Sequence, residues 1–344
     1  MTERRVTHGK VKVFSNTTEP GVVGQIKRVA EWRHRDGVEL AGTLARKLWR
    51  RGDRFRMLPF PQAVHIEITN RCNLKCVMCP HPTMTRTQGE MSEELFRKII
   101  AEISGHRLLL ENVAIMGLGE PMLHTGFERL VTIAAEAGVP NLYVSTNGTA
   151  LTEKRAQRLV EDGALGRLII SLDGATKETY EAIRIGGKFD LVMENTARVL
   201  RIKRALGRRK PVVTLQILTM PQTRHEIDDF VRRWEPELGD GDEILIKEVD
   251  TFGGLVDDLR LDADREPVKR IPCRMLWKDM SIAWDGQVTV CCKDVYYQLA
   301  VGDANTQSLG EIWNAPKWNA YRRLHKSGEW DRIHPCDICR EWYV

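Results

Sequence analysis

The sequence lacks the features that would place it in a membrane or direct it out of the cell. It contains no run of about 18 consecutive apolar residues, which a membrane-spanning helix requires. The N-terminal residues Met-Thr-Glu-Arg-Arg are not followed by an apolar segment, so no secretory signal is predicted. The charged fraction of 29% and the hydrophobic fraction of 42% are ordinary, and 344 residues can bury a full core. The composition therefore predicts a soluble globular protein, with one large domain and an appendage.

Cysteine is absent from the long middle of the chain. The eight cysteines form three groups, which are Cys72, Cys76 and Cys79, then Cys273, Cys291 and Cys292, and finally Cys336 and Cys339. Grouping of this kind indicates metal ligation in a reducing compartment rather than a framework of disulfides. We therefore expect a cytoplasmic protein.

The basic N-terminal segment lacks interleaved aromatic platforms for nucleic-acid bases. Residues 1–62 contain 14 Lys and Arg and 6 Asp and Glu, which is a charge of 14 − 6 = +8. Apolar residues recur at helical intervals between residues 24 and 51, at Ile26, Val29, Ala30, Leu40, Leu44 and Leu48. This pattern favours amphipathic helices with a solvated basic face, and it makes nucleic-acid binding the weaker interpretation.

The chemistry of the chain is expected to centre on the loop that follows a short strand near residues 64–68. Cys72, Cys76 and Cys79 have the spacing C-x3-C-x2-C. Three thiolates at this spacing can bind three corners of a [4Fe-4S] cube and leave the fourth iron without a protein ligand. Zinc is a poorer match, because zinc sites usually have four ligands at paired C-x2-C spacings.

This loop resembles the signature of the radical S-adenosylmethionine (SAM) enzymes. The resemblance implies that SAM chelates the open iron and that its cleavage yields a 5′-deoxyadenosyl radical, after reduction by a flavodoxin- or ferredoxin-type partner. The family more often has an aromatic residue just before the third cysteine, near the adenine, where this chain has Met78. Methionine is adaptable enough to pack against a ring in the same place.

A second element resembles the family's Gly-Gly-Glu-Pro motif, with Leu118 inserted between its glycines. It consists of Gly117, Gly119, Glu120 and Pro121 and follows the predicted strand that begins at Asn112. Glycines at the carboxyl end of a strand permit a close approach to the backbone, and a carboxylate can bind an amine. By resemblance, this element holds the methionine amino group of SAM.

Strands and helices then alternate to residue 250, which predicts a parallel sheet with right-handed crossovers. Polar residues at the carboxyl ends of such strands usually line the site. Here they are Ser145, Thr146, Asn147, Ser171 and Asp173. Their side chains suit the ribose hydroxyls and the carboxylate of SAM, although Asn147-Gly148 and Asp173-Gly174 are equally well read as turns.

About six β-α units are predicted in residues 63–250, too few for a closed eight-fold barrel. The number agrees with the partial (β/α)6 barrel of the radical SAM family. We therefore expect an α/β fold with a mostly helical N-terminal extension (1–62), the partial barrel (63–250), and a linker with a C-terminal twitch- or SPASM-like domain (251–344). Candidate catalytic contacts in the barrel are Arg184, Lys247 and Glu248. Arg184 lies at a predicted helix end, where a solvated arginine favoured by the helix dipole is the slightly stronger interpretation. Lys247 and Glu248 lie near the end of the last strand.

The C-terminal cysteines predict a second metal site. Cys273 precedes a hairpin around Asp285-Gly286, Cys291 ends it, and Cys336 and Cys339 form a C-x2-C pair. The spacing C-x17-C-x44-C-x2-C resembles the twitch form of the SPASM appendage, which holds one auxiliary [4Fe-4S] cluster, as in the aminocyclitol dehydrogenase of butirosin biosynthesis. The longer form has further cysteines, whereas five residues follow Cys339, so we expect two clusters in all. Four-cysteine zinc is the competing interpretation of this site.

Cys292 remains outside both predicted sets of ligands. It is either a buried thiol beside the cluster, or an alternative ligand, or a hydrogen-atom donor facing the substrate.

The family resemblance implies three possible reactions. The first is oxidation of an alcohol in a hydroxylated small molecule of the sugar or aminocyclitol type, with the auxiliary cluster accepting an electron. The second is epimerisation of a carbohydrate or natural product with Cys292 returning a hydrogen atom, and the third is peptide maturation. A maturase usually has an N-terminal winged-helix domain, for which residues 1–62 show no convincing β-hairpin. A non-catalytic metal-binding module would not need the polar strand ends of a SAM pocket.

Overall fold

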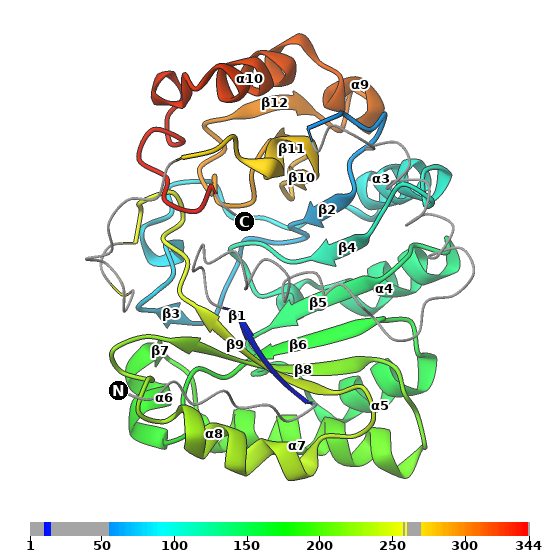
Figure 1. The fold of residues 1–344 in the computed structure, drawn as a ribbon. Coiled ribbons are helices and arrows are strands. Elements are labelled where there is room, and N and C mark those ends of the chain that lie inside the picture. The colour runs from blue at the N-terminus through cyan, green and yellow to red at the C-terminus, as the bar shows by residue number, and fades with distance from the viewer. Residues whose placement is uncertain (1–9, 15–54, 257–258, 260–269, 343–344) are drawn as a thin grey trace. The chain divides into compact units, whose positions relative to one another are not determined.

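The computed structural model describes residues 10–14, 55–256, 259 and 270–342 (Figure 1). The chain divides into two compact units. Among the described residues, one contains residues 10–14, 146–249 and 259, and the other contains residues 55–145, 250–256 and 270–342. The C-terminal residues thus share a unit with the first cysteine loop, and the expected domain bounds stay a prediction. Within the described part of the chain, no helix combines the length and apolar character needed to cross a bilayer.

The unit that contains the cysteines is built on strands β2 (Ala63–Ile66), β4 (Asn112–Ile115) and β5 (Leu142–Thr146), which are parallel. Helices α3 (Glu93–Gly105) and α4 (Phe127–Glu136) connect them and pack beside each other. Ser92 is the N-cap of α3, because its side chain accepts a hydrogen bond from the Leu95 amide at 3.1 Å.

The C-terminal hairpin extends this same sheet. Strand β10 (Asp279–Ile282) pairs in parallel with β2, on the side opposite β4, and β11 (Gln287–Thr289) and β12 (Ala300–Asp303) continue antiparallel from it (Figure 1). The hairpin around Asp285-Gly286 is confirmed, and Gly286 has the positive φ of 92° that such a turn requires. The register places Ser281 beside His65. Residues from the end of the chain therefore lie next to the strand that leads into the cysteine loop.

Helices α9 (Leu309–Trp313) and α10 (Pro316–Ser327) complete this unit. Trp313 and Trp318 are fully buried, and the Arg322 guanidinium lies 4.2 Å from the Trp313 ring centroid. Arg322 also donates hydrogen bonds to the carbonyls of Leu276 and Trp313, both at 2.8 Å. These contacts hold α10 in place, with the inward-facing His325 one turn further along it.

The other unit contains four parallel strands in the order β1, β9, β8, β6. Their bounds are β1 (Val11–Phe14), β6 (Arg167–Ser171), β8 (Val212–Thr219) and β9 (Glu243–Glu248). The helices of this unit are α5 (Glu153–Asp162), α6 (Lys177–Ile183), α7 (Phe189–Ala205) and α8 (Ile227–Trp234). The two-residue strands are β3 (Lys75–Cys76) in the unit with the cysteines and β7 (Arg184–Ile185) in this unit. Strand β1 was not predicted, and the helices expected between residues 24 and 51 lie outside the described residues.

Candidate active site

The first cysteine loop is supported by buried polar residues directly before it. The fully buried Asn70 amide donates to the Thr87 carbonyl at 2.8 Å and accepts from the Gly89 amide at 2.9 Å. The loop turns tightly between Cys76 and Cys79, whose backbone groups are joined by a 3.1 Å hydrogen bond. The three predicted ligands of the SAM-binding cluster thus lie on one short, braced loop, and each is half-buried.

The two glycines of the Gly-x-Gly-Glu-Pro element are required by the packing of the chain itself. A Cβ atom on Gly119 would lie 2.1 Å from the Thr69 carbonyl oxygen, and one on Gly117 would lie 2.6 Å from the Glu67 Cγ. No side chain fits at these distances. The sequence predicted a close backbone approach here, and in the structure the approaching group is the segment that leads into the cysteine loop.

The remaining predicted SAM contacts of this unit lie around that element. Glu120 is buried, and its carboxylate accepts a hydrogen bond from the Met122 amide at 3.1 Å, which caps a short 3₁₀ helix that begins at Pro121. Met78 is also buried, and Ser145 is half-buried near the end of β5. Their role in binding SAM stays a prediction.

Other predicted site residues belong to the unit that contains residues 146–249. Arg184 donates from Nε (3.1 Å) and Nη2 (2.5 Å) to the Asp173 carboxylate, which also accepts the Leu218 amide at 2.8 Å. Both side chains are buried, so the structure places Arg184 in an internal ion pair rather than at a solvated helix end. Asn147 accepts from the Thr149 amide at 2.9 Å in a local turn. Ser171 accepts from Gln216 at 3.4 Å, and Lys247 and Glu248 are half-buried near the end of β9.

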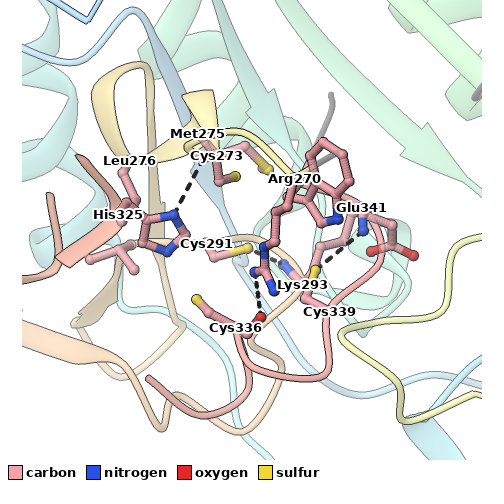
Figure 2. Close-up of a pocket in the computed structure, with 12 residues that line it drawn as sticks. Arg270, Cys273, Met275, Leu276, Cys291, Lys293, His325, Cys336, Cys339 and Glu341 are labelled. Atoms are coloured by element: carbon pink, nitrogen blue, oxygen red, sulfur yellow. Dashed lines mark hydrogen bonds between the residues drawn. The ribbon is translucent and has the colours of Figure 1, made fainter. Parts of the chain in front are cut away.

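Four of the C-terminal cysteines surround one pocket. The four-cysteine pocket is lined by Cys273, Cys291, Cys336 and Cys339, with an apolar wall that includes Met275, Leu276 and Val290 (Figure 2). Arg270 closes one side, where it donates to the Cys336 carbonyl at 2.5 Å and lies over the Trp330 ring. Cys292 does not line this pocket. The structure therefore places together the four residues that the spacing predicted as ligands, and it leaves Cys292 outside their set.

The surroundings of these sulfur atoms suit thiolates bound to a positively charged metal centre. Burial raises the pKa of Cys336 to about 12, and it also raises the pKa of Cys273, Cys291 and Cys339. Four buried thiolates would repel one another unless a cationic group lay between them. A cluster of four irons supplies that positive charge.

Backbone amides support the same interpretation at both cysteine sites. The Cys79 sulfur accepts from the amide two residues later at 3.5 Å, and the Cys291 and Cys339 sulfurs accept in the same way at 3.3 Å. Hydrogen bonds of this kind stabilise sulfur ligands and tune iron-sulfur clusters.

The described cysteines are not arranged as a single-ion centre. In residues 10–14, 55–256, 259 and 270–342, no three His, Cys, Asp or Glu side chains converge closely enough to share one metal ion.

A second, larger cavity adjoins this pocket in the same unit. The polar cavity has a volume of about 130 Å³ and is lined by Gly117 and Leu118, by Cys291 and Cys292, and by His65, Glu67, Met116, Asp250, Phe252, Ser281, Ile282, Lys293, Asp294, Val295 and Tyr297. Cys291 and Lys293 line both spaces. The motif predicted to bind SAM and the predicted auxiliary ligand Cys291 thus border one cavity.

Two ion pairs supply fixed charges in the wall of the polar cavity. Arg86 binds the Glu67 carboxylate with both terminal nitrogens, at 2.6 and 3.3 Å, and Glu67 also accepts the Leu118 amide at 3.2 Å. Lys293 pairs with Asp250. Burial opposes the charge of Lys293, but Asp250, Cys292 and Glu341 together outweigh burial and raise the pKa of Lys293. The ammonium therefore stays charged and acts as a fixed cation rather than a base.

His65 and Ser281 add polar groups whose hydrogen-bonding capacity is unused. The His65 Nδ1 and the Ser281 Oγ are buried and have no partner within the described residues. Burial, with Lys278 and Lys293, lowers the pKa of His65 to about 4, so its imidazole is neutral at pH 7. His65 on β2 and Ser281 on β10 are neighbours, and both residues line the cavity.

Sequence reasoning missed the residues that make this cavity polar. His65, Glu67 and Lys293 flank cysteine motifs but belong to none of them. A signal did exist for His65, a polar residue inside an otherwise apolar strand. No local pattern shows that Ser281 and Lys293 would lie beside it.

Comparison with known proteins agrees with the geometry. Residues 66–233 match the model of the radical SAM superfamily, and residues 273–340 match the iron-sulfur cluster-binding domain called SPASM. The mycofactocin maturase MftC of Mycobacterium tuberculosis is 36% identical over 138 residues, which are 40% of this chain and 34% of the maturase. The chain thus matches only about a third of the length of that relative.

Solved structures share the fold at low sequence identity. Streptococcus suis SuiB bound to its precursor peptide SuiA has a TM-score of 0.66 at 14% identity, covering 96% of this chain and 78% of that one. BtrN in complex with AdoMet and 2-DOIA has a TM-score of 0.55 at 18% identity, covering 82% and 93%. The expected α/β partial barrel is thereby confirmed.

The two matched domains imply SAM and two [4Fe-4S] clusters as cofactors. The donor set of the four-cysteine pocket and the amide bonds to the sulfurs fit this requirement. The chain belongs to the radical SAM superfamily and carries a SPASM iron-sulfur cluster-binding domain after its radical SAM domain.

Proposed function

We propose that the chain is an oxidoreductase that binds a polar, hydroxylated small molecule in the polar cavity and oxidises one of its alcohols to a ketone. The observation that carries the proposal is that Cys291 lines both the polar cavity and the four-cysteine pocket. When bound, the SAM-carrying cluster supplies a 5′-deoxyadenosyl radical after reduction by a flavodoxin- or ferredoxin-type partner, and the auxiliary cluster supplies an acceptor for one electron.

Residues of the chain account for the other requirements of an alcohol oxidation. The substrate must lose a hydrogen atom from carbon, a proton from its hydroxyl group, and one electron. The neutral His65 lines the cavity and can take the proton of the hydroxyl group, and Ser281 beside it can bind a neighbouring oxygen. The Lys293 ammonium favours the developing negative charge on the oxygen. The electron then has to pass only Cys291 on its way from the substrate to the auxiliary cluster.

Arg184, Lys247 and Glu248 stay proposed substrate contacts of lower rank. Arg184 is already paired with Asp173, whereas His65 lines the polar cavity. We therefore assign the first contact with the hydroxyl to His65.

Epimerisation is the second candidate, and a specific observation favours it. Cys292 lines the polar cavity but not the four-cysteine pocket, so its thiol belongs to the substrate side of the wall. A thiol in this position can return a hydrogen atom to a carbon radical, and the product then keeps the mass of the substrate.

Two of the similar proteins suggest the substrate classes to be tested. BtrN is described with 2-DOIA, and SuiB with a precursor peptide. Aminocyclitols, hexoses and cysteine-containing peptides should therefore be incubated anaerobically with the reconstituted protein, SAM and dithionite. We expect the 5′-deoxyadenosine released to rise with an aminocyclitol or sugar. A rise with peptides alone would instead identify a maturase.

Product mass separates the two main candidates. Oxidation lowers the mass by two hydrogens, whereas epimerisation in deuterated water leaves the skeleton unchanged and adds one deuterium. Cys292→Ala should leave oxidation intact and abolish epimerisation. Cys291→Ala should remove about four irons per chain, since it removes one ligand of one four-iron cluster. Full turnover with product of altered mass in the Cys291 variant would contradict electron transfer through this wall.

A further inference from the structure

His325 lies at the wall of the four-cysteine pocket and faces inward. It sits on α10, is only 1% exposed, and lies at the pocket edge near Cys273, Cys291 and Cys336 in Figure 2. Its ring packs 6.3 Å from the Trp330 ring. The buried contacts of Arg322 hold α10, so the position of the ring is fixed by the fold.

One ring nitrogen of His325 already has a partner. Nδ1 accepts a hydrogen bond from the Cys273 amide at 3.3 Å. An imidazole nitrogen that accepts carries no hydrogen, so the neutral ring has its hydrogen on Nε2. Nε2 is therefore a hydrogen-bond donor.

This donor has no acceptor in the described part of the chain. The Nε2 atom is buried and makes no hydrogen bond. The carboxylate on the pocket, Glu341, lies on the other side in Figure 2, where it binds Thr251. A buried donor without an acceptor costs about 1–3 kcal/mol. Apart from Glu341, the side chains that line the pocket offer acceptors only as sulfur atoms.

We propose that His325 Nε2–H donates a hydrogen bond to a sulfur of the auxiliary cluster and makes that cluster easier to reduce. Hydrogen bonds to cluster sulfurs stabilise the more negative, reduced state. The arrangement joins two contacts in one side chain, because Nδ1 orients the Cys273 backbone and the unpartnered Nε2 is left for the cluster. His325 then sets how readily the cluster accepts an electron, whatever the substrate is.

The reduction potential of the auxiliary cluster tests this proposal directly. Replacement of Cys72, Cys76 and Cys79 by Ala leaves the auxiliary cluster as the one that binds iron, and EPR-monitored titration then gives its potential. In this background His325→Leu should shift the potential to a more negative value. His325→Gln, which keeps an N–H donor at a similar reach, should restore part of the shift. His334→Ala serves as the matched control, because His334 is exposed and lies two residues before Cys336.

Two results would overturn the proposal. One is an unchanged potential in His325→Leu, and the other is an equal shift in the Leu and Gln variants, which would indicate a packing role. A second measurement does not depend on the Leu variant loading iron. Protein labelled with ¹⁵N-histidine should show coupling between the ring nitrogen and the reduced cluster in pulsed EPR, and absence of that coupling also refutes the hydrogen bond.

Discussion

The ion pair between Arg86 and Glu67 predicts a large and asymmetric response to mutation. Their side chains are 13% and 5% exposed, and Glu67 also holds the Leu118 amide beside Gly117. Arg86→Met would leave a buried carboxylate without its cation. Removal of one partner of a buried pair costs about 3–5 kcal/mol. At about 2–4 °C per kcal/mol for a unit of 150–250 residues, the apparent unfolding midpoint should fall by roughly 6–20 °C.

The reverse change should cost less. In Glu67→Gln the guanidinium keeps its hydrogen bond to the Val295 carbonyl, at 3.2 Å, and its position 4.3 Å from the Tyr297 ring centroid. The double variant Arg86→Met/Glu67→Gln leaves neither charge buried, so it should be more stable than the sum of the single effects by about 0.5–3 kcal/mol.

Thermal unfolding of the anaerobically reconstituted protein, followed by circular dichroism, measures these effects. The matched control is Arg97→Met, which breaks a pair with Glu93 in which both side chains are 46% exposed and should cost at most about 0.5 kcal/mol. If Arg86→Met were no more destabilising than this control, or if the two single effects were additive, the claim of a buried coupled pair would be wrong.

Three further predictions concern the sites themselves. Gly119→Ala should prevent the first cysteine loop from seating and lower the iron content by about half, because its Cβ would meet a carbonyl at 2.1 Å, whereas Gly310→Ala, with open space around it, should keep all the iron. Cys79→Ala should also lose about four irons per chain and release no 5′-deoxyadenosine, with iron analysis and chromatography as the assays. Because the folded pKa of His65 is lowered from 6.5 to about 4, the unfolded state binds more protons below pH 6.5. Stability should therefore fall as the pH decreases from about 6.5 to about 4, and His65→Gln should flatten that dependence in urea unfolding.

Sequence patterns predicted the helices and turns that are stabilised by residues close together in the chain. Helix α5 runs from Glu153 to Asp162 as expected, because Thr152 caps it and its apolar face has a regular period. The choice of Cys291 rather than Cys292 for the second site followed from the spacing after Gly286, and the structure places Cys291, without Cys292, on the four-cysteine pocket.

What could not be predicted depends on pairing between distant segments. Strand β1 is stabilised by β9, and no pattern within Val11–Phe14 names that partner. The same holds for the parallel register of β10 with β2, which brings Ser281 to His65. The polar cavity is a product of that register, so its composition was not visible in any motif. His325 was missed for the same reason, since a histidine within a basic helix carries no sign of what it faces.

The pairing of β10 with β2 also limits how the chain can be dissected. A fragment that ended near residue 250 would contain every motif of the radical SAM domain, yet it would leave the backbone donors and acceptors of Ala63–Ile66 without their C-terminal partners. An unpaired strand edge of this kind promotes association with other chains. During synthesis the same strand lacks this partner until residues 67–278 have been made and Asp279–Ile282 can pair with it. The incomplete sheet must therefore be protected from association with other chains while the protein is still on the ribosome.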